Sequence, residues 1–263
     1  KIRSSRRNAT SKNADANDQV AGEIRWPHGH VVVEELAGRI AELTFVLPGG
    51  VECRPFAPPP WLDDVAAQST TALLRRLRGE WPCVPFGFDI DRDRFEDWGP
   101  TFANDAIDLP HGHSSSSAWT VTHADATSLR LTIDYPSGHP ISRLHRVIEP
   151  DQSVPALDIT LAIEPRYDCR LPIGLHPIFR LPPEPGSVEV ELSGDQTIMT
   201  FPGRLTRNSH FRPNARSSLD QLALDDDQAL PAVPLHHPKP PGGIEIFAIS
   251  PQGADDTVAG MPE

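Results

Sequence analysis

The most regular feature of the sequence is an alternation of apolar and polar residues. Residues 157–163 read LDITLAI, residues 129–133 read LRLTI and residues 188–192 read VEVEL. In an extended chain, successive side chains point to opposite faces, so this alternation collects the apolar side chains on one face. We therefore predict a β-strand with one buried face at each of these three places.

Turn-forming residues separate these predicted strands. The sequences YPSGHP (135–140), EPDQSVP (149–155) and PPEPGS (182–187) combine proline, which fixes φ, with glycine, which permits positive φ. Short strands with such turns between them are typical of an antiparallel sandwich or barrel. A last strand is predicted at residues 244–250, IEIFAIS. The pattern therefore predicts an all-β fold with few, short helices.

One stretch has helical character. Residues 61–80, WLDDVAAQSTTALLRRLRGE, offer Asp63 or Asp64 as an N-cap and end in basic side chains, which suit the helix dipole. Residues 69–71, STT, are poor helix formers in the middle of it. The 29 prolines among 263 residues, about twice the usual share, also favour loops over long helices.

The charge and cysteine content of the chain indicate which binding partners and which cellular compartment are compatible with it. The formal net charge of −12 disfavours binding to a nucleic-acid backbone, which needs clustered Lys and Arg. Cys53, Cys83 and Cys169 are far apart and odd in number, so they predict neither a disulfide framework nor a zinc knuckle. No apolar run is long enough to span a bilayer. A cytoplasmic setting without nucleic-acid or membrane partners fits best, and oligomeric state is left open.

The chain is expected to contain one large domain. Residues 1–20 are basic and polar and predict a disordered segment, residues 21–250 carry the strand pattern, and residues 251–263 form a polar tail. A domain of this length can bury a substantial core.

Three stretches combine histidine, arginine or tryptophan with turn residues. They are LRGEWPCVPFGFD (77–89), LPHGHSSSSAW (109–119) and LPIGLHPIFRLP (171–182). Taken singly, each is weak, because a lone histidine in an apolar loop is more often a hydrogen-bonded structural residue.

Taken together, the three stretches resemble the aldose 1-epimerase (galactose mutarotase-like) superfamily, in particular its hexose-6-phosphate-mutarotase-like branch. The matches occur in the family's order over about residues 25–250. They are a His-Gly motif with a tryptophan further on (His111, Gly112, Trp119), a Gly-Leu-His-Pro-aromatic stretch (Gly174 to Pro177, Phe179), and an arginine segment leading into Pro-Cys-x-Pro-Phe-Gly (Arg78 to Glu80, Pro82 to Gly87).

The resemblance implies a large antiparallel β-sandwich that binds a monosaccharide or sugar phosphate and interconverts its anomers without a cofactor. Histidine suits the acid in such a reaction because its pKa lies near neutrality. By resemblance, His176 is the acid, His111 a second donor to the sugar, and Arg78 a clamp for a hydroxyl or phosphate. Trp119 or Phe179 offers an apolar face to the sugar ring, although core packing explains such aromatic residues equally well.

The sequence departs from the family in two ways. The family's general base, a glutamate in a C-terminal Glu-Pro-like segment, has no match: Glu245 lies in a predicted strand and Glu263 is the last residue. We expect either that the chain stops several strands early or that the base is lost, which would leave a non-catalytic sugar-binding sandwich. In addition, residues 114–117 are serines where relatives commonly carry an arginine.

Other candidate sites are weaker. Two HGH triplets, at 28–30 and 111–113, lack a neighbouring Cys, Asp or Glu at ligand spacing, so we predict no metal site. Cys83, between two prolines, is expected to be a packing residue. Residues 91–97, DRDRFED, and His236 with His237 are expected to be solvated. A purely structural domain remains a third alternative to an enzyme or a sugar-binding protein.

Overall fold

The computed structural model describes residues 19–58, 77–86, 111–180, 196–203, 211–218 and 247–251. The chain divides into two compact units: Lys1–Asp89 with Gly99–Arg180, and Ile90–Trp98 with Leu181–Glu263. Each unit is described by itself.

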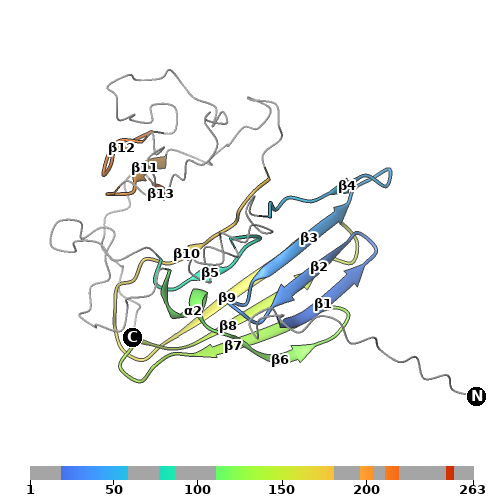
Figure 1. The fold of residues 1–263 in the computed structure, drawn as a ribbon, viewed down its shortest axis with the longest axis horizontal. Helices are drawn as coiled ribbons and strands as arrows, with labels where there is room; N and C mark the ends of the chain where they lie inside the picture. Colours follow the sequence, from blue (N-terminus) through green and yellow to red (C-terminus); the bar gives the residue numbers. More distant parts are fainter. Residues whose placement is uncertain are drawn as a thin grey trace, which may run out of the picture. The chain divides into compact units, whose positions relative to one another are not determined.

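The first unit contains two four-stranded antiparallel sheets, drawn as two layers in Figure 1. The first sheet has the order β1-β2-β3-β4, and the second has the order β6-β7-β8-β9. The strands of the first sheet are β1 (Val20–Trp26), β2 (Gly29–Glu34), β3 (Ile40–Val46) and β4 (Glu52–Cys53). Those of the second are β6 (Thr120–Ala124), β7 (Leu129–Asp134), β8 (Ile141–Pro150) and β9 (Leu157–Pro165).

The alternating pattern of the sequence produces the core between these sheets. In β7, Leu129, Leu131 and Ile133 are buried, whereas the residues between them are exposed or half-buried. The main apolar cluster joins such residues from both sheets, among them Ile24, Val31, Val33, Leu43, Leu131, Leu144 and Ile148. Burial of these faces at about 25 cal/mol per Å² of apolar surface is the main force that holds the layers together.

Short elements join the first sheet to the site described below. β5 (Pro82–Cys83) and β10 (Gly174–Leu175) form an antiparallel pair, and α2 (Gly112–Ser116) contacts β5. The backbone of Glu80 exchanges two hydrogen bonds with that of Ile40, at 2.9 and 3.1 Å. The segment before β5 thus continues the ladder beyond the start of β3.

The second unit contains one described sheet. Its order is β12-β11-β13, built from β11 (Gln196–Thr200), β12 (Arg216–Ser217) and β13 (Phe247–Pro251). Ile198 is buried in the central strand, and the Thr200 hydroxyl donates to the Arg212 carbonyl at 2.5 Å.

The predicted all-β class is confirmed: the described residues are rich in antiparallel strands and include one short helix, α2. The strands predicted at 129–133 and 157–163 are β7 and β9, and residues 247–250 of the last predicted strand lie in β13. The strand predicted at 188–192 and most of the helix predicted at 61–80 lie outside the described residues; residues 77–80 of that stretch are not helical. No described helix has the length and apolar character that crossing a membrane requires.

Candidate functional site

The structure brings together three stretches that are far apart in the sequence. The β5–β10 ladder pairs Gly174 with Cys83, and the His176 amide donates to the Trp81 carbonyl at 2.9 Å. A parallel bridge joins Val84 to Gly112, at the start of α2. The motifs that contain Arg78, His111 and His176 therefore meet at one end of the first unit.

The two histidines lie against each other within an aromatic group. The ring centroids of His111 and His176 are 5.0 Å apart, and the rings are nearly perpendicular, at 82°. The indole of Trp81 stacks on the His176 imidazole with centroids 4.2 Å apart and planes inclined by 13°. Phe86 lies 5.3 Å from His111 and 6.5 Å from His176 between ring centroids.

Backbone geometry fixes the position of His111. His111 has φ of 61° and Gly112 has φ of 80°, both in the left-handed region. A Cβ on Gly112 would lie 2.3 Å from the Val84 carbonyl oxygen, so only glycine fits this crossing. A non-glycine residue such as His111 with positive φ is uncommon and is found disproportionately at functional sites.

The serines after His111 hold this loop to β5. The Ser114 hydroxyl donates to the Pro82 carbonyl and accepts from the Val84 amide, each at 3.0 Å. The Ser115 hydroxyl lies 2.7 Å from the His111 carbonyl and 3.2 Å from that of Pro82. Serine at these positions, noted from the sequence only as a departure from the family, thus has a structural role beside the histidine pair.

Burial controls the protonation of the pair. Burial, followed by the charge of His176, lowers the pKa of His111 to about 3. Burial also lowers the pKa of His176. His111 is therefore neutral near pH 7. A neutral imidazole can donate one hydrogen bond and accept another but adds no positive charge beside His176.

Arg78 belongs to a buried ion-pair network. Its guanidinium binds the carboxylate of Glu34, which Arg39 also binds, with the Arg39 Nε 3.0 Å from Glu34 Oε2. Burial raises the pKa of Glu34, but the charges and hydrogen bonds of Arg39 and then Arg78 outweigh it, so the net pKa is lowered. Arg78 retains some exposure, whereas Glu34 and Arg39 are buried.

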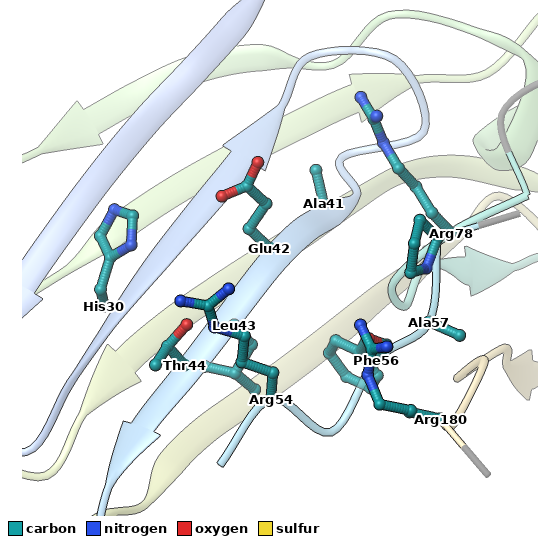
Figure 2. Close-up of a pocket in the computed structure, with 11 residues that line it drawn as sticks. His30, Ala41, Glu42, Leu43, Thr44, Arg54, Phe56, Ala57, Arg78 and Arg180 are labelled. Carbon is teal, nitrogen blue, oxygen red and sulfur yellow. The ribbon is translucent and has the colours of Figure 1, made fainter. Parts of the chain in front are cut away.

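A pocket of about 340 Å³ lies over β3 beside Arg78. Arg54, Arg78 and Arg180 are among its lining residues, and Glu42 and His30 line it from the strands, as Figure 2 shows. The rest of the lining is Ala41, Leu43, Thr44, Phe56, Ala57 and Pro58. Arg54 is paired with Glu52 at 2.9 Å, and Arg180 donates to the Phe56 carbonyl at 3.4 Å. Arg78 thus lines this pocket, whereas His111 and His176 do not.

The two aromatic residues suggested as sugar platforms have contrasting positions. Trp119 is 1% exposed, belongs to the main core cluster, and donates through Nε1 to the Ser114 carbonyl at 2.9 Å. Phe179 is 62% exposed and lies against Phe56, with ring centroids 6.0 Å apart. Their roles in sugar binding stay predictions; the contacts of Trp119 are those of a packing residue.

Two contacts at the site are not predictable from the sequence. Trp81 stacks on His176, and Glu80 forms a buried ion pair with Arg146 of β8. The available signal was the Arg-Gly-Glu-Trp-Pro stretch itself, in which a charged and a large aromatic residue stand next to each other before a proline. Arg146 occupies a core-facing position of an alternating strand. Burying its charge there is costly unless a partner, here Glu80 from a distant segment, neutralises it.

Alternative sites have structural explanations. His30 of the first HGH triplet pairs with Glu23 at 3.0 Å. Within the described ranges, no three His, Cys, Asp or Glu side chains are grouped as a metal site would require. Cys83 is buried beside Trp81, as expected for a packing residue.

No family model matches the chain, and no curated protein matches it. Solved structures do, and they are aldose 1-epimerase and galactose mutarotase-like proteins. One is a candidate aldose 1-epimerase from Escherichia coli K12, 16% identical, covering 81% of this chain and 66% of that one, with a TM-score of 0.44. A galactose mutarotase related enzyme from Lactobacillus acidophilus is 15% identical, with coverages of 80% and 64% and a TM-score of 0.45. A galactose mutarotase-like protein from Lactobacillus casei ATCC 334 is 13% identical, with coverages of 89% and 76% and a TM-score of 0.46.

These similarities do not by themselves assign an activity. The identities are 13 to 16%, and the chain spans only 66% and 64% of the length of the first two structures. The activity proposed below therefore depends on the residues of the site.

Proposed function

We propose that this protein interconverts the α and β anomers of a hexose or hexose phosphate by acid–base ring opening. The observation that carries the proposal is the meeting of His111 and His176, with ring centroids 5.0 Å apart. These residues, and the adjoining segment with Arg78, are the ones that the sequence resemblance assigns to a mutarotase site.

Ring opening needs two proton transfers. An acid protonates the ring oxygen while a base removes the proton of the anomeric hydroxyl, after which the aldehyde carbon can rotate and the ring can close on its other face. In this proposal His176 is the acid. His111, which is neutral near pH 7, donates a hydrogen bond to a sugar hydroxyl without competing for the proton.

The arginine-lined pocket supports a substrate with an anionic substituent. Arg54, Arg78 and Arg180 can bind a phosphate through the planar fork of the guanidinium group. The exposed Arg54–Glu52 pair is of the kind that contributes little to stability, so exchanging it for a ligand has a small cost. Hexose 6-phosphates are therefore the first substrates to test.

The alternative function is sugar binding without catalysis. The observation that favours it is the missing match for the general-base glutamate; Glu245 and Glu263 lie outside the described residues. A general base must reach its proton directly or through one water. Without one, the histidines and arginines would still bind a sugar, but ring opening would not be accelerated.

Exchange NMR between the α and β anomers separates the two functions. The enzyme proposal expects the protein to accelerate exchange of glucose, galactose or their 6-phosphates above the buffer rate. Ligand-dependent chemical shifts without acceleration would establish the binding alternative, and neither effect would refute both.

His176→Asn tests the role of the acid. We expect it to lower kcat by about 10²-fold or more, the usual contribution of general acid catalysis, with little change in thermal stability. The matched control is His145→Asn, because His145 lies on β8 and pairs with Glu164 at 2.6 Å on the exposed face of the second sheet. If His176→Asn retains full activity, or unfolds while His145→Asn does not, the acid assignment is wrong.

A further inference from the structure

Trp81 has a contact that neither the fold nor the proposed reaction explains. Its indole lies face to face with the imidazole of His176, with centroids 4.2 Å apart and planes inclined by 13°. The side chain is fully buried, and its carbonyl accepts a hydrogen bond from the His176 amide at 2.9 Å. Trp81 thus holds His176 through both backbone and ring.

We propose that Trp81 is a positioning residue for His176, whose indole face keeps the imidazole in one plane and favours its protonated form. The inference rests on the proposed function in giving His176 the role of proton donor. The contact itself does not depend on the reaction.

Two opposing effects act on His176. Burial penalises the charged imidazolium and lowers the pKa of His176, which by itself would leave little acid near neutral pH. The face of an indole carries negative electrostatic potential, and a cation within about 6 Å of its centroid is attracted to it. The attraction strengthens where water is excluded, so a buried tryptophan is the side chain best able to offset the burial of an acid.

The other titratable groups near this stack do not supply the same effect. His111 lies nearly perpendicular to the His176 ring and is neutral near pH 7, because burial, followed by the charge of His176, lowers its pKa to about 3. Glu80, next to Trp81, directs its carboxylate to Arg146. Cys83 remains a neutral thiol, since burial raises its pKa to about 12. A backbone hydrogen bond of His176 also favours its charged form, although burial outweighs it. Among these neighbouring side chains, the indole is the one placed to favour the imidazolium.

The test follows the His176 imidazole by NMR over a pH titration in the full chain, with the His176 signals identified by their absence in His176→Asn. We expect Trp81→Leu to move the titration midpoint of His176 to lower pH, and Trp81→Phe to move it less. The alkaline limb of the anomer-exchange profile, where His176 loses its proton, should move in the same direction, with a loss of about tenfold at neutral pH in Trp81→Leu.

The matched control is Trp26→Leu. Trp26 is a buried tryptophan of β1 that lies edge-on against Phe45, with centroids 6.2 Å apart, and no described contact joins it to His176. It should lower stability as any large core truncation does but leave the His176 titration unchanged.

Fluorinated tryptophan provides a second test that does not depend on whether Trp81→Leu folds. Incorporation of fluorotryptophans withdraws electron density from the indole face with little change in shape, so the His176 midpoint should fall progressively with the number of fluorine atoms. An unchanged midpoint in this series, or in a folded Trp81→Leu protein, overturns the inference. If the wild-type protein exchanges no anomers, the proposed function fails, while the titration still decides the role of Trp81.

Discussion

At the scale of single residues, the site depends on which of two adjacent imidazoles carries a proton. Two positive charges 5.0 Å apart between ring centroids would repel each other. Burial lowers the pKa of both imidazoles, and the charge of His176 lowers that of His111 further, to about 3. In the proposed reaction, His111 therefore stays neutral near pH 7 and His176 supplies the proton.

His111 is buried in its neutral form, so the free energy of unfolding should depend on pH. The folded pKa of about 3 lies below the ordinary value of 6.5, so between these values the unfolded chain binds a proton that the folded chain does not. We expect the free energy of unfolding to fall as pH drops from about 6.5 to 4, by up to about 1.4 kcal/mol per pH unit for this group. His139, with a pKa lowered to about 4 by burial, adds to the slope.

Urea unfolding at a series of pH values would measure this slope. His111→Gln removes one of the histidines whose pKa is lowered by burial and should make the dependence shallower over the same range. An identical slope in the variant would mean that His111 is protonated in the folded state.

At the scale of elements, glycines permit the close crossings that bring the motifs together. Gly112 and Gly49 both have positive φ, at 80° and 86°, but a Cβ on Gly49 would meet nothing within 4 Å, whereas one on Gly112 would meet Val84 O at 2.3 Å. Gly49→Ala should therefore cost only the conformational strain, about 1 kcal/mol. Gly112→Ala should cost about 3 kcal/mol.

Comparing the thermal unfolding of the two variants separates the steric clash at Gly112 from the cost of a positive φ, which both positions share. The His111 ring should also shift relative to His176 in Gly112→Ala, which the chemical shifts of both imidazoles would report. Equal destabilisation by the two substitutions would show that α2 and β5 can move apart enough to accommodate a Cβ on residue 112.

The elements differ in how far the sequence predicts them. β7 and β9 were predictable because each alternates cleanly, whereas the consecutive valines of β2, Val31 to Val33, hide the alternation. β5 and β10 have two residues each, too few for any period, and exist through pairing of distant segments. For that reason the meeting of His111 with His176 could be expected only from family resemblance, and the Trp81 stack could not be expected at all.

At the scale of the whole first unit, the core is not purely apolar. Glu34, Arg39, Glu80 and Arg146 are all buried, and Arg146 of the second sheet binds Glu80 from the segment that continues the first sheet. Ion pairs of this kind add little net stability compared with apolar residues, but breaking one partner leaves an uncompensated buried charge. We therefore expect the pair to specify which residues face each other across the layers more than to strengthen the core.

A double-mutant cycle on Glu80 and Arg146 tests this reasoning. Arg146→Met leaves the Glu80 carboxylate buried and unpaired and should lower the free energy of unfolding by about 3 to 5 kcal/mol. The double variant Glu80→Gln with Arg146→Met removes both charges and should lose clearly less than the sum of the single changes, as measured by urea unfolding. Additivity within about 0.5 kcal/mol would show that the two charges do not depend on each other. Since Glu80 adjoins Trp81, the single variants should also shift the titration midpoint of His176. If the unpaired buried charge causes that shift, the double variant should restore the wild-type midpoint.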